Sequence, residues 1–115
     1  METMFAGRRM RRVALACLAA GCVLAAGGGA PACAAHHTVT IDGVKYVPET
    51  LTVKRGDTVT WVNKDPFPHT VTAQGRFDSR SIAAGGKWRY VARQSGTYDY
   101  ICTFHPDMKG SLNVE

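Results

Sequence analysis

Residue types that bind soft metal ions recur at regular intervals near the C-terminal end of this 115-residue sequence. Cys102, His105 and Met108 are spaced three residues apart. In one short loop after a strand, side chains at this spacing can all turn toward a single point. A fourth donor must come from elsewhere. His69 is the obvious candidate, because it follows the rigid turn Pro66-Phe67-Pro68 and opens a strand-like segment.

These four side chains form a set of two imidazoles, one thiolate and one thioether. Thiolates and thioethers are soft ligands that favour copper(I), and imidazole suits copper in either oxidation state. A trigonal set of two histidines and one cysteine, with a weak axial methionine, is the arrangement of blue-copper electron-transfer sites. The pattern therefore predicts one copper ion bound by His69, Cys102, His105 and Met108.

Each ligand residue has a simpler role when it is taken alone. A lone buried cysteine usually behaves as a small hydrophobic residue, and a lone methionine fills gaps in a core. Their joint spacing favours a metal.

Zinc is the main rival ion, but zinc seldom recruits methionine. A nucleophilic Cys102 with His105 as its base is conceivable, but it would leave Met108 unexplained. We therefore expect no enzyme.

The elements that must position these ligands read as short strands. Residues 58–63 alternate between apolar and polar side chains, and residues 96–102 lead directly into Cys102. The prolines at 66 and 68 exclude a central strand at 65–68, because proline lacks a backbone donor. Short strands separated by Gly and Pro turns predict an all-β sandwich or barrel. The remaining strand-like segments are 38–41, 46–47, 51–53, 69–73, 87–91 and 111–114, while 74–86 is expected to be a loop with room for one short strand.

The first 35 residues are expected to be a signal peptide, outside the domain. A basic cluster at 8–12 precedes an apolar run at 13–26 and a small-residue stretch ending at 35, which is the layout of a secretory signal. The run is shorter than the roughly 20 residues that a membrane span requires. Cleavage after Ala34 or Ala35 would leave one exported domain, residues 36–115. Cys22 is an alternative site for a lipid anchor, and the paired arginines leave a twin-arginine route open.

Removal of this segment changes what the cysteines and the charge imply. Cys102 would be the one cysteine left, which in an exported protein suggests a reactive thiol, an intermolecular bridge or a metal ligand. A domain of this size buries only roughly 60% of its unfolded surface, so an ion bound to the folded state would add useful stability. From residue 36 onward there are 10 basic and 8 acidic residues. A net charge of +2 is not that of a nucleic-acid-binding protein.

These residues resemble the cupredoxin family, most closely the amicyanins, with pseudoazurin and plastocyanin as more distant relatives. The resemblance spans nearly the whole mature part. Residues 46–63 are similar to the early strands of the family, and Pro68-His69 matches the position of the first ligand. Residues 96–100 lead into Cys102, and the two-residue gaps to His105 and Met108 match the short ligand loop of amicyanins.

The resemblance implies a Greek-key β-sandwich with a type 1 copper site near one end. It also implies a monomeric periplasmic electron carrier between redox proteins, such as a dehydrogenase as donor and a cytochrome as acceptor. His105 would reach the surface through an apolar patch that contacts these partners. The residues expected to form the patch are Phe67, Pro68, Phe104 and Pro106.

Two positions raise separate hypotheses. Family members commonly have asparagine just after the first histidine, where this chain has Thr70. Because hydrogen bonds around the metal ligands tune redox potential, we expect a potential unlike that of a typical amicyanin. Cleavage after Ala34 would also place His37 third from a free amine, an arrangement that can chelate copper(II), so His36 and His37 are candidates for a second copper site.

Two other functional classes use the same ligands. A protein that stores or delivers copper would release the ion readily to an acceptor, whereas an electron carrier would keep it and change colour reversibly. A metal-dependent enzyme would need an open coordination position, and the four-ligand set leaves none.

Overall fold

A computed structural model describes residues 33–115, of which Ala34–Glu115 form one compact unit. The basic cluster, the apolar run and Cys22 of the expected signal peptide lie outside the described residues. From residue 33 onward every regular element is a strand. Within this part of the chain, no helix has the length and apolar character needed to cross a membrane.

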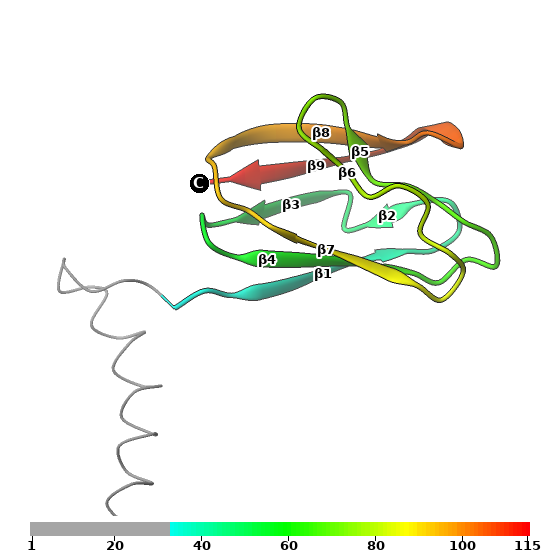
Figure 1. Ribbon diagram of the computed structural model, residues 1–115, viewed down its shortest axis with the longest axis horizontal. Coiled ribbons are helices and arrows are strands. Elements are labelled where there is room, and N and C mark those ends of the chain that lie inside the picture. The colour runs from blue at the N-terminus through cyan, green and yellow to red at the C-terminus, as the bar shows by residue number, and fades with distance from the viewer. Residues whose placement is uncertain (1–32) are drawn as a thin grey trace, which may run out of the picture. The chain divides into compact units, whose positions relative to one another are not determined.

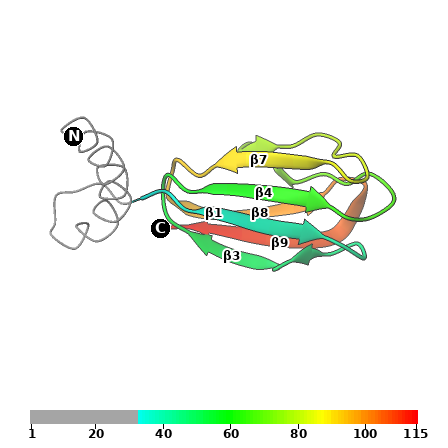
Figure 2. The ribbon, with the colours of Figure 1, turned by 90° about the horizontal axis from the view of Figure 1, so that it is seen from below.

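Nine strands form two sheets that pack face to face (Figures 1 and 2). One sheet has the strand order β2-β1-β4-β7, and the other has the order β3-β9-β8-β5-β6. The predicted all-β sandwich is therefore confirmed. The strand bounds are β1 His36–Ile41, β2 Tyr46–Val47, β3 Thr50–Val53, β4 Thr58–Asn63, β5 Thr72–Ala73, β6 Phe77–Asp78, β7 Lys87–Val91, β8 Gly96–Cys102 and β9 His105–Val114.

The period of two along the central strands decides which side chains enter the core. On β4, Val59, Trp61 and Asn63 are each 0% exposed. On β8, Tyr98, Tyr100 and Cys102 are buried while Asp99 between them is exposed. Cys102 is thus the last inward-facing residue of a strand whose preceding inward residues are core aromatics, so the packing of β8 aims its sulfur into the protein.

An aromatic group fills the space between the sheets. The Trp61 indole N–H donates to the Tyr100 hydroxyl at 3.3 Å, and the rings of Tyr46 and Tyr100 meet edge to face at 4.7 Å. Gly110 on β9 lies against the ring of Tyr100, where an added Cβ would come within 2.5 Å of ring carbon Cζ. The ring of Tyr100 therefore occupies the volume that any other residue at position 110 would need.

The structure corrects several predicted boundaries. The segment expected at 69–73 is a strand only at Thr72–Ala73, and His69 forms an isolated bridge with Ile82. The last strand starts at His105 instead of 111, so it contains two of the predicted ligands. The undecided stretch 74–86 contains β6. β1 starts at His36, two residues earlier than expected, because it extends its parallel pairing with β4 to Thr58.

Candidate metal centre

Two of the predicted ligands face each other across a tight hairpin. β8 and β9 are joined by the turn Thr103-Phe104, and Cys102 pairs with His105. The register shifts between Ile101 and Cys102, since Ile101 pairs with Lys109. Residues 106–108 are therefore extra residues on the β9 side, and such a bulge re-aims the side chains next to it. The ligand loop expected from the three-residue spacing is this bulged hairpin.

His69 is fixed from the opposite side by backbone bonds. It is 0% exposed, and its N–H and C=O both bond to Ile82, at 3.2 and 2.7 Å. The connection from β4 to His69 is held by Asn63, whose side-chain amide donates to the carbonyls of Phe67 and Ile82, both at 2.9 Å. Because a buried amide with satisfied donors has one stable orientation, the turn before His69 is rigid.

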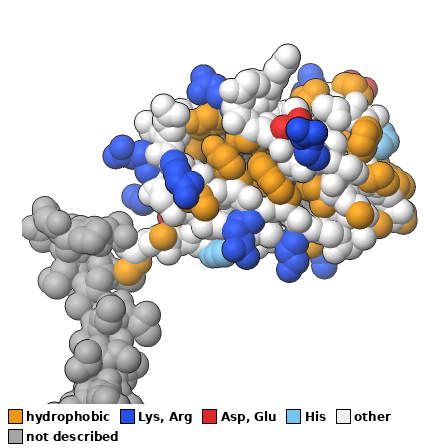
Figure 3. All heavy atoms as spheres, in the orientation of Figure 1, with side chains coloured by type: hydrophobic (Ala, Val, Ile, Leu, Met, Phe, Trp, Pro, Cys, Tyr) orange, Lys and Arg blue, Asp and Glu red, His pale blue; other side chains and the backbone are white. Residues whose placement is uncertain are grey.

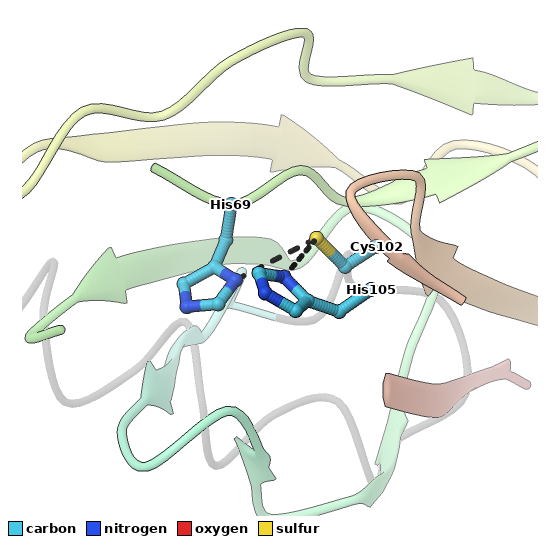
Figure 4. A group of neighbouring side chains, drawn as sticks. All are labelled: His69, Cys102 and His105. Carbon is cyan, nitrogen blue, oxygen red and sulfur yellow. Dashed lines mark hydrogen bonds between the residues drawn. The ribbon is translucent and has the colours of Figure 1, made fainter. Parts of the chain in front are cut away.

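The two segments bring three ligand atoms together. Cys102 Sγ lies 3.6 Å from His69 Nδ1 and 4.0 Å from His105 Nδ1, and the three atoms all lie within 4.8 Å of one another. Figure 4 shows both imidazole rings directed toward the sulfur. Metal bonds of roughly 2.0–2.3 Å from one ion can reach three atoms at these separations. Among residues 33–115 this is the one group of three His, Cys, Asp or Glu residues placed in this way.

Met108 lies three residues beyond His105, on the same strand. Its side chain is 4% exposed and belongs to the hydrophobic core. It also lines a hollow with Tyr46 and Val44. Its burial at this end of β9 is compatible with an axial thioether, and it stays a predicted ligand.

Thr70 links the two ligand-bearing segments. Its backbone N–H donates to Cys102 Sγ at 3.3 Å, and its hydroxyl oxygen accepts the backbone N–H of Thr103 at 2.9 Å. Thr72 donates its own hydroxyl to the same oxygen at 3.0 Å. The donor to the sulfur is thus backbone, while the side chain joins the histidine segment to the hairpin.

Asp65 holds the far side of the first histidine, a role that sequence reasoning missed. Its carboxylate lies 2.7 Å from His69 Nε2 and also accepts the backbone N–H groups of Gly43 and Val44, at 2.7 and 2.9 Å. Burial favours a higher pKa for Asp65, but the backbone donors of Val44 and Gly43, together with His69, outweigh it and hold this pKa below its usual range. An ionised Asp65 fixes a proton on Nε2 and leaves Nδ1 free to bind a metal.

The same carboxylate supports a strained turn. Gly43 and Val44 have φ angles of +64° and +60°, and a β-branched residue rarely adopts such a φ. The bonds from both N–H groups to Asp65 stabilise this conformation. The position of Asp65, four residues before His69 and directly before Pro66, is the sequence feature that could have revealed it.

Tyr46 is a second missed residue near the cysteine. Its hydroxyl donates to the Thr70 carbonyl at 2.5 Å. Burial raises its pKa far above the ordinary value, and negative charge on Cys102 raises it further. Tyr46 therefore stays protonated, and it positions the peptide whose N–H faces the sulfur.

Part of the site reaches the surface at one end of the domain. His105 is partly exposed, and with Phe67, Pro68 and Phe104 it lines a shallow hollow. Phe67 is 39% exposed and Phe104 is 52% exposed. Pro106 is also exposed beside them in the sequence. Figure 3 shows hydrophobic side chains, with a histidine among them, at the right-hand end, where no Lys or Arg is visible in this view.

The histidines of the N-terminal segment lie in β1, away from this group. His37 Nε2 bonds to the Asp57 carboxylate at 2.9 Å, and His36 Nε2 lies 3.3 Å from the Thr60 hydroxyl. The side chains of His36 and His37 are thus bonded to Thr60 and Asp57. Neither histidine belongs to the group formed by His69, Cys102 and His105.

Known proteins resemble this chain in sequence and in structure. The family model described as "Cupredoxin-like domain" matches residues 13–114. Amicyanin of Paracoccus denitrificans is 35% identical over 123 residues, covering 86% of this chain and 93% of that protein. Amicyanin of Paracoccus versutus is 34% identical, and there the match spans 63% of its length. An oxidised proline-to-alanine mutant of amicyanin superposes with a TM-score of 0.66 at 36% identity, covering 70% of this chain and 82% of that one.

Proposed function

Because this chain belongs to the cupredoxin family, we propose that its copper ion is held by His69, Cys102, His105 and Met108. The protein is a type 1 copper electron-transfer protein and not an enzyme. The observation that carries the ligand assignment is the convergence of His69 Nδ1, Cys102 Sγ and His105 Nδ1. Copper, when bound, supplies a one-electron couple between its two oxidation states.

The chain contributes a nearly fixed set of donors. His69 is locked by Ile82 and Asp65, and Cys102 is held by its strand and by the N–H of Thr70. Because the surrounding bonds resist movement, these donors would shift little when the charge of a bound ion changes, which would favour fast electron transfer. The buried thioether of Met108 would be the fourth and weakest of the donors that hold the ion.

The apolar hollow around His105 is proposed as the surface for redox partners. Phe67, Pro68, Phe104 and Pro106 surround the ligand that is partly exposed, so a partner seated there comes close to the ion. Small apolar interfaces suit weak electron-transfer encounters. We propose a dehydrogenase as electron donor and a cytochrome as acceptor, with a monomeric carrier exported to the periplasm by its N-terminal signal.

A copper titration of the exported protein, followed by visible absorption, tests the ligand set. A thiolate-to-copper band should saturate at one ion per chain, bleach on reduction and be absent in Cys102→Ser. Met108→Leu should keep the band but shift its energy and the potential, because only the axial donor is lost. A folded protein without the band, or a Met108→Leu variant with an unchanged spectrum and potential, contradicts the assignment.

The alternative of copper delivery makes a different prediction. A delivery protein needs ligands that an acceptor can reach, and here His69 and Cys102 are both 0% exposed. The rate of copper loss to a strong external chelator distinguishes the two functions. An electron carrier should retain its ion over many cycles of oxidation and reduction.

A further inference from the structure

We propose that signal cleavage occurs after Ala34, so that the exported protein begins at Ala35 and its new α-ammonium group forms an ion pair with the buried carboxylate of Asp57. This inference rests on the proposed export. It selects one of two cleavage sites that the sequence alone allows.

Ala35 is already part of the fold, although it precedes the first strand. Its backbone nitrogen donates to Asp57 Oδ1 at 2.9 Å, and its carbonyl accepts the N–H of Thr58 at 2.9 Å. The second bond extends the parallel pairing of β1 and β4 by one step. Cleavage after Ala35 would remove both contacts, whereas cleavage after Ala34 keeps both and adds a charge to the first.

Within residues 33–115, the one ionisable side chain that bonds to the Asp57 carboxylate is the imidazole of His37, and no Lys or Arg side chain pairs with it. Asp57 is 5% exposed. Its side chain accepts the N–H groups of Ala35 and Lys54 and bonds to His37 Nε2 at 2.9 Å. The backbone donors of Ala35 and Lys54, with His37, lower its pKa to about 2 against the opposing effect of burial. Asp57 is therefore ionised at neutral pH, and an opposite charge within about 4–6 Å favours this charged form.

The sequence before the proposed bond suits this site. Signal cleavage favours small residues in an A-x-A-like pattern, and Ala32-Cys33-Ala34 supplies alanine at both selected positions. The bond after Ala35 would place Cys33 and Ala35 at those positions. Ala34 and Ala35 are both exposed, so neither bond is distinguished by burial, and the contacts of Ala35 decide between them.

The same contacts bear on copper binding by the new terminus. Chelation of copper(II) by a free amine and a third-position histidine would need the amine and the ring of His37 together. Both groups are engaged by Asp57 when the terminus is at Ala35. Figure 1 places the start of β1 at the end of the sandwich opposite the β8–β9 turn. The α-ammonium therefore acts on folding stability and leaves the type 1 site unaltered.

The first experiment expresses the full chain in a Gram-negative host and measures the intact mass and the N-terminal sequence of the exported protein. A terminus at Ala35 is expected. A terminus at His36 or at Cys22 overturns this inference and leaves export intact. An uncut chain retained in the cytoplasm overturns the export proposal instead.

The second experiment isolates the charge. One glycine inserted between Ala34 and Ala35 moves the α-ammonium away but keeps an amide at Ala35. Because the insertion breaks the ion pair, it should lower Tm by about 4 °C or more in a domain of this size. It should have no effect in the Asp57→Asn background, where the carboxylate is already absent. An equal loss in both backgrounds overturns the ion pair.

A measurement on the unaltered protein covers the case in which Asp57→Asn does not fold. The α-amino group should react with an amine reagent at neutral pH about tenfold more slowly than a free α-amine, because one pKa unit changes the unprotonated fraction tenfold. An ordinary reaction rate refutes the pairing of the amine with Asp57.

Discussion

Replacement of Asp65 by asparagine gives the sharpest test of how the site is tuned. The Asp65 side chain is 6% exposed and accepts three hydrogen bonds, from His69, Gly43 and Val44. Asparagine keeps one oxygen. If that oxygen takes the Oδ2 position, the bonds from His69 and Val44 survive, and the new NH₂ group faces the N–H of Gly43.

The expected change in copper affinity follows from the loss of negative charge on the group that accepts the bond from His69. A hydrogen bond to a carboxylate is roughly twice as strong as a neutral one, and partners in this position typically contribute 10–100-fold to metal affinity. Because the bond from His69 is weakened but retained, we expect copper affinity to fall about tenfold, which is the lower limit of this range. The loss falls mainly on copper(II), which needs the more basic imidazole. A tenfold loss on one oxidation state corresponds to a rise in potential of about 59 mV.

The assay is a spectroelectrochemical titration of the copper-loaded protein. Asp107→Asn is the matched control, since it also removes one carboxylate from near the ligands, but Asp107 is exposed and its charge is screened by solvent. If Asp65→Asn keeps its copper and raises the potential no more than the control does, the reasoning about His69 is wrong. The facing N–H groups should also destabilise the metal-free protein by about 1–3 kcal/mol.

Three further predictions test other parts of the structure. Gly110→Ala should lower the free energy of unfolding by about 1–3 kcal/mol through overpacking against Tyr100, and urea denaturation should show a smaller loss in a Tyr100→Leu background; equal losses would mean that the ring is not the obstacle. Thr70→Asn should change the reduction potential, because it replaces the hydroxyl that accepts the N–H of Thr103; an unchanged potential in voltammetry would refute a tuning role. Asp57→Asn should destabilise the protein by about 1–2 kcal/mol at pH 6. Because the folded-state pKa of Asp57 is lowered to about 2, its contribution is present above pH 4 and is lost as pH falls toward 2, so unfolding curves of the variant and the parent should converge there.

The sequence was sufficient for those parts of the fold that follow from alternation. Residues 58–63 alternate between apolar and polar side chains, and both this segment and the segment expected at 96–102 are strands with these bounds. The three-residue spacing of Cys102, His105 and Met108 pointed to one ligand group, and the structure brings the first two together with His69. Local pattern succeeds here because these residues are close in sequence, either along one strand or across the tight hairpin between β8 and β9.

What the sequence could not supply depends on contacts between distant segments. Asp65 is held by the backbone N–H groups of Gly43 and Val44, more than twenty residues earlier. No local sequence pattern predicts a contact between such distant residues. The strand-like residues after His69 were assigned one long strand, but the chain there bonds to Ile82 and to Cys102 instead of continuing one ladder. The early start of β9 was missed because proline at 106 argues against a strand, and the register shift beside it makes room for that residue.

The order in which the sheets are closed has a consequence for when the ion can be captured. β3 and β8 both pair with β9, so their sheet lacks its central connection until the last strand has been synthesised. Cys102 and His105 face each other only across that final hairpin, and His69 lies 33 residues before the cysteine. Such distant pairings can form only after both strands of a pair are available, and they make folding slower than that of helical domains. A nascent or translocating chain therefore carries its ligands apart, and it meets copper as a whole domain in the compartment where it folds.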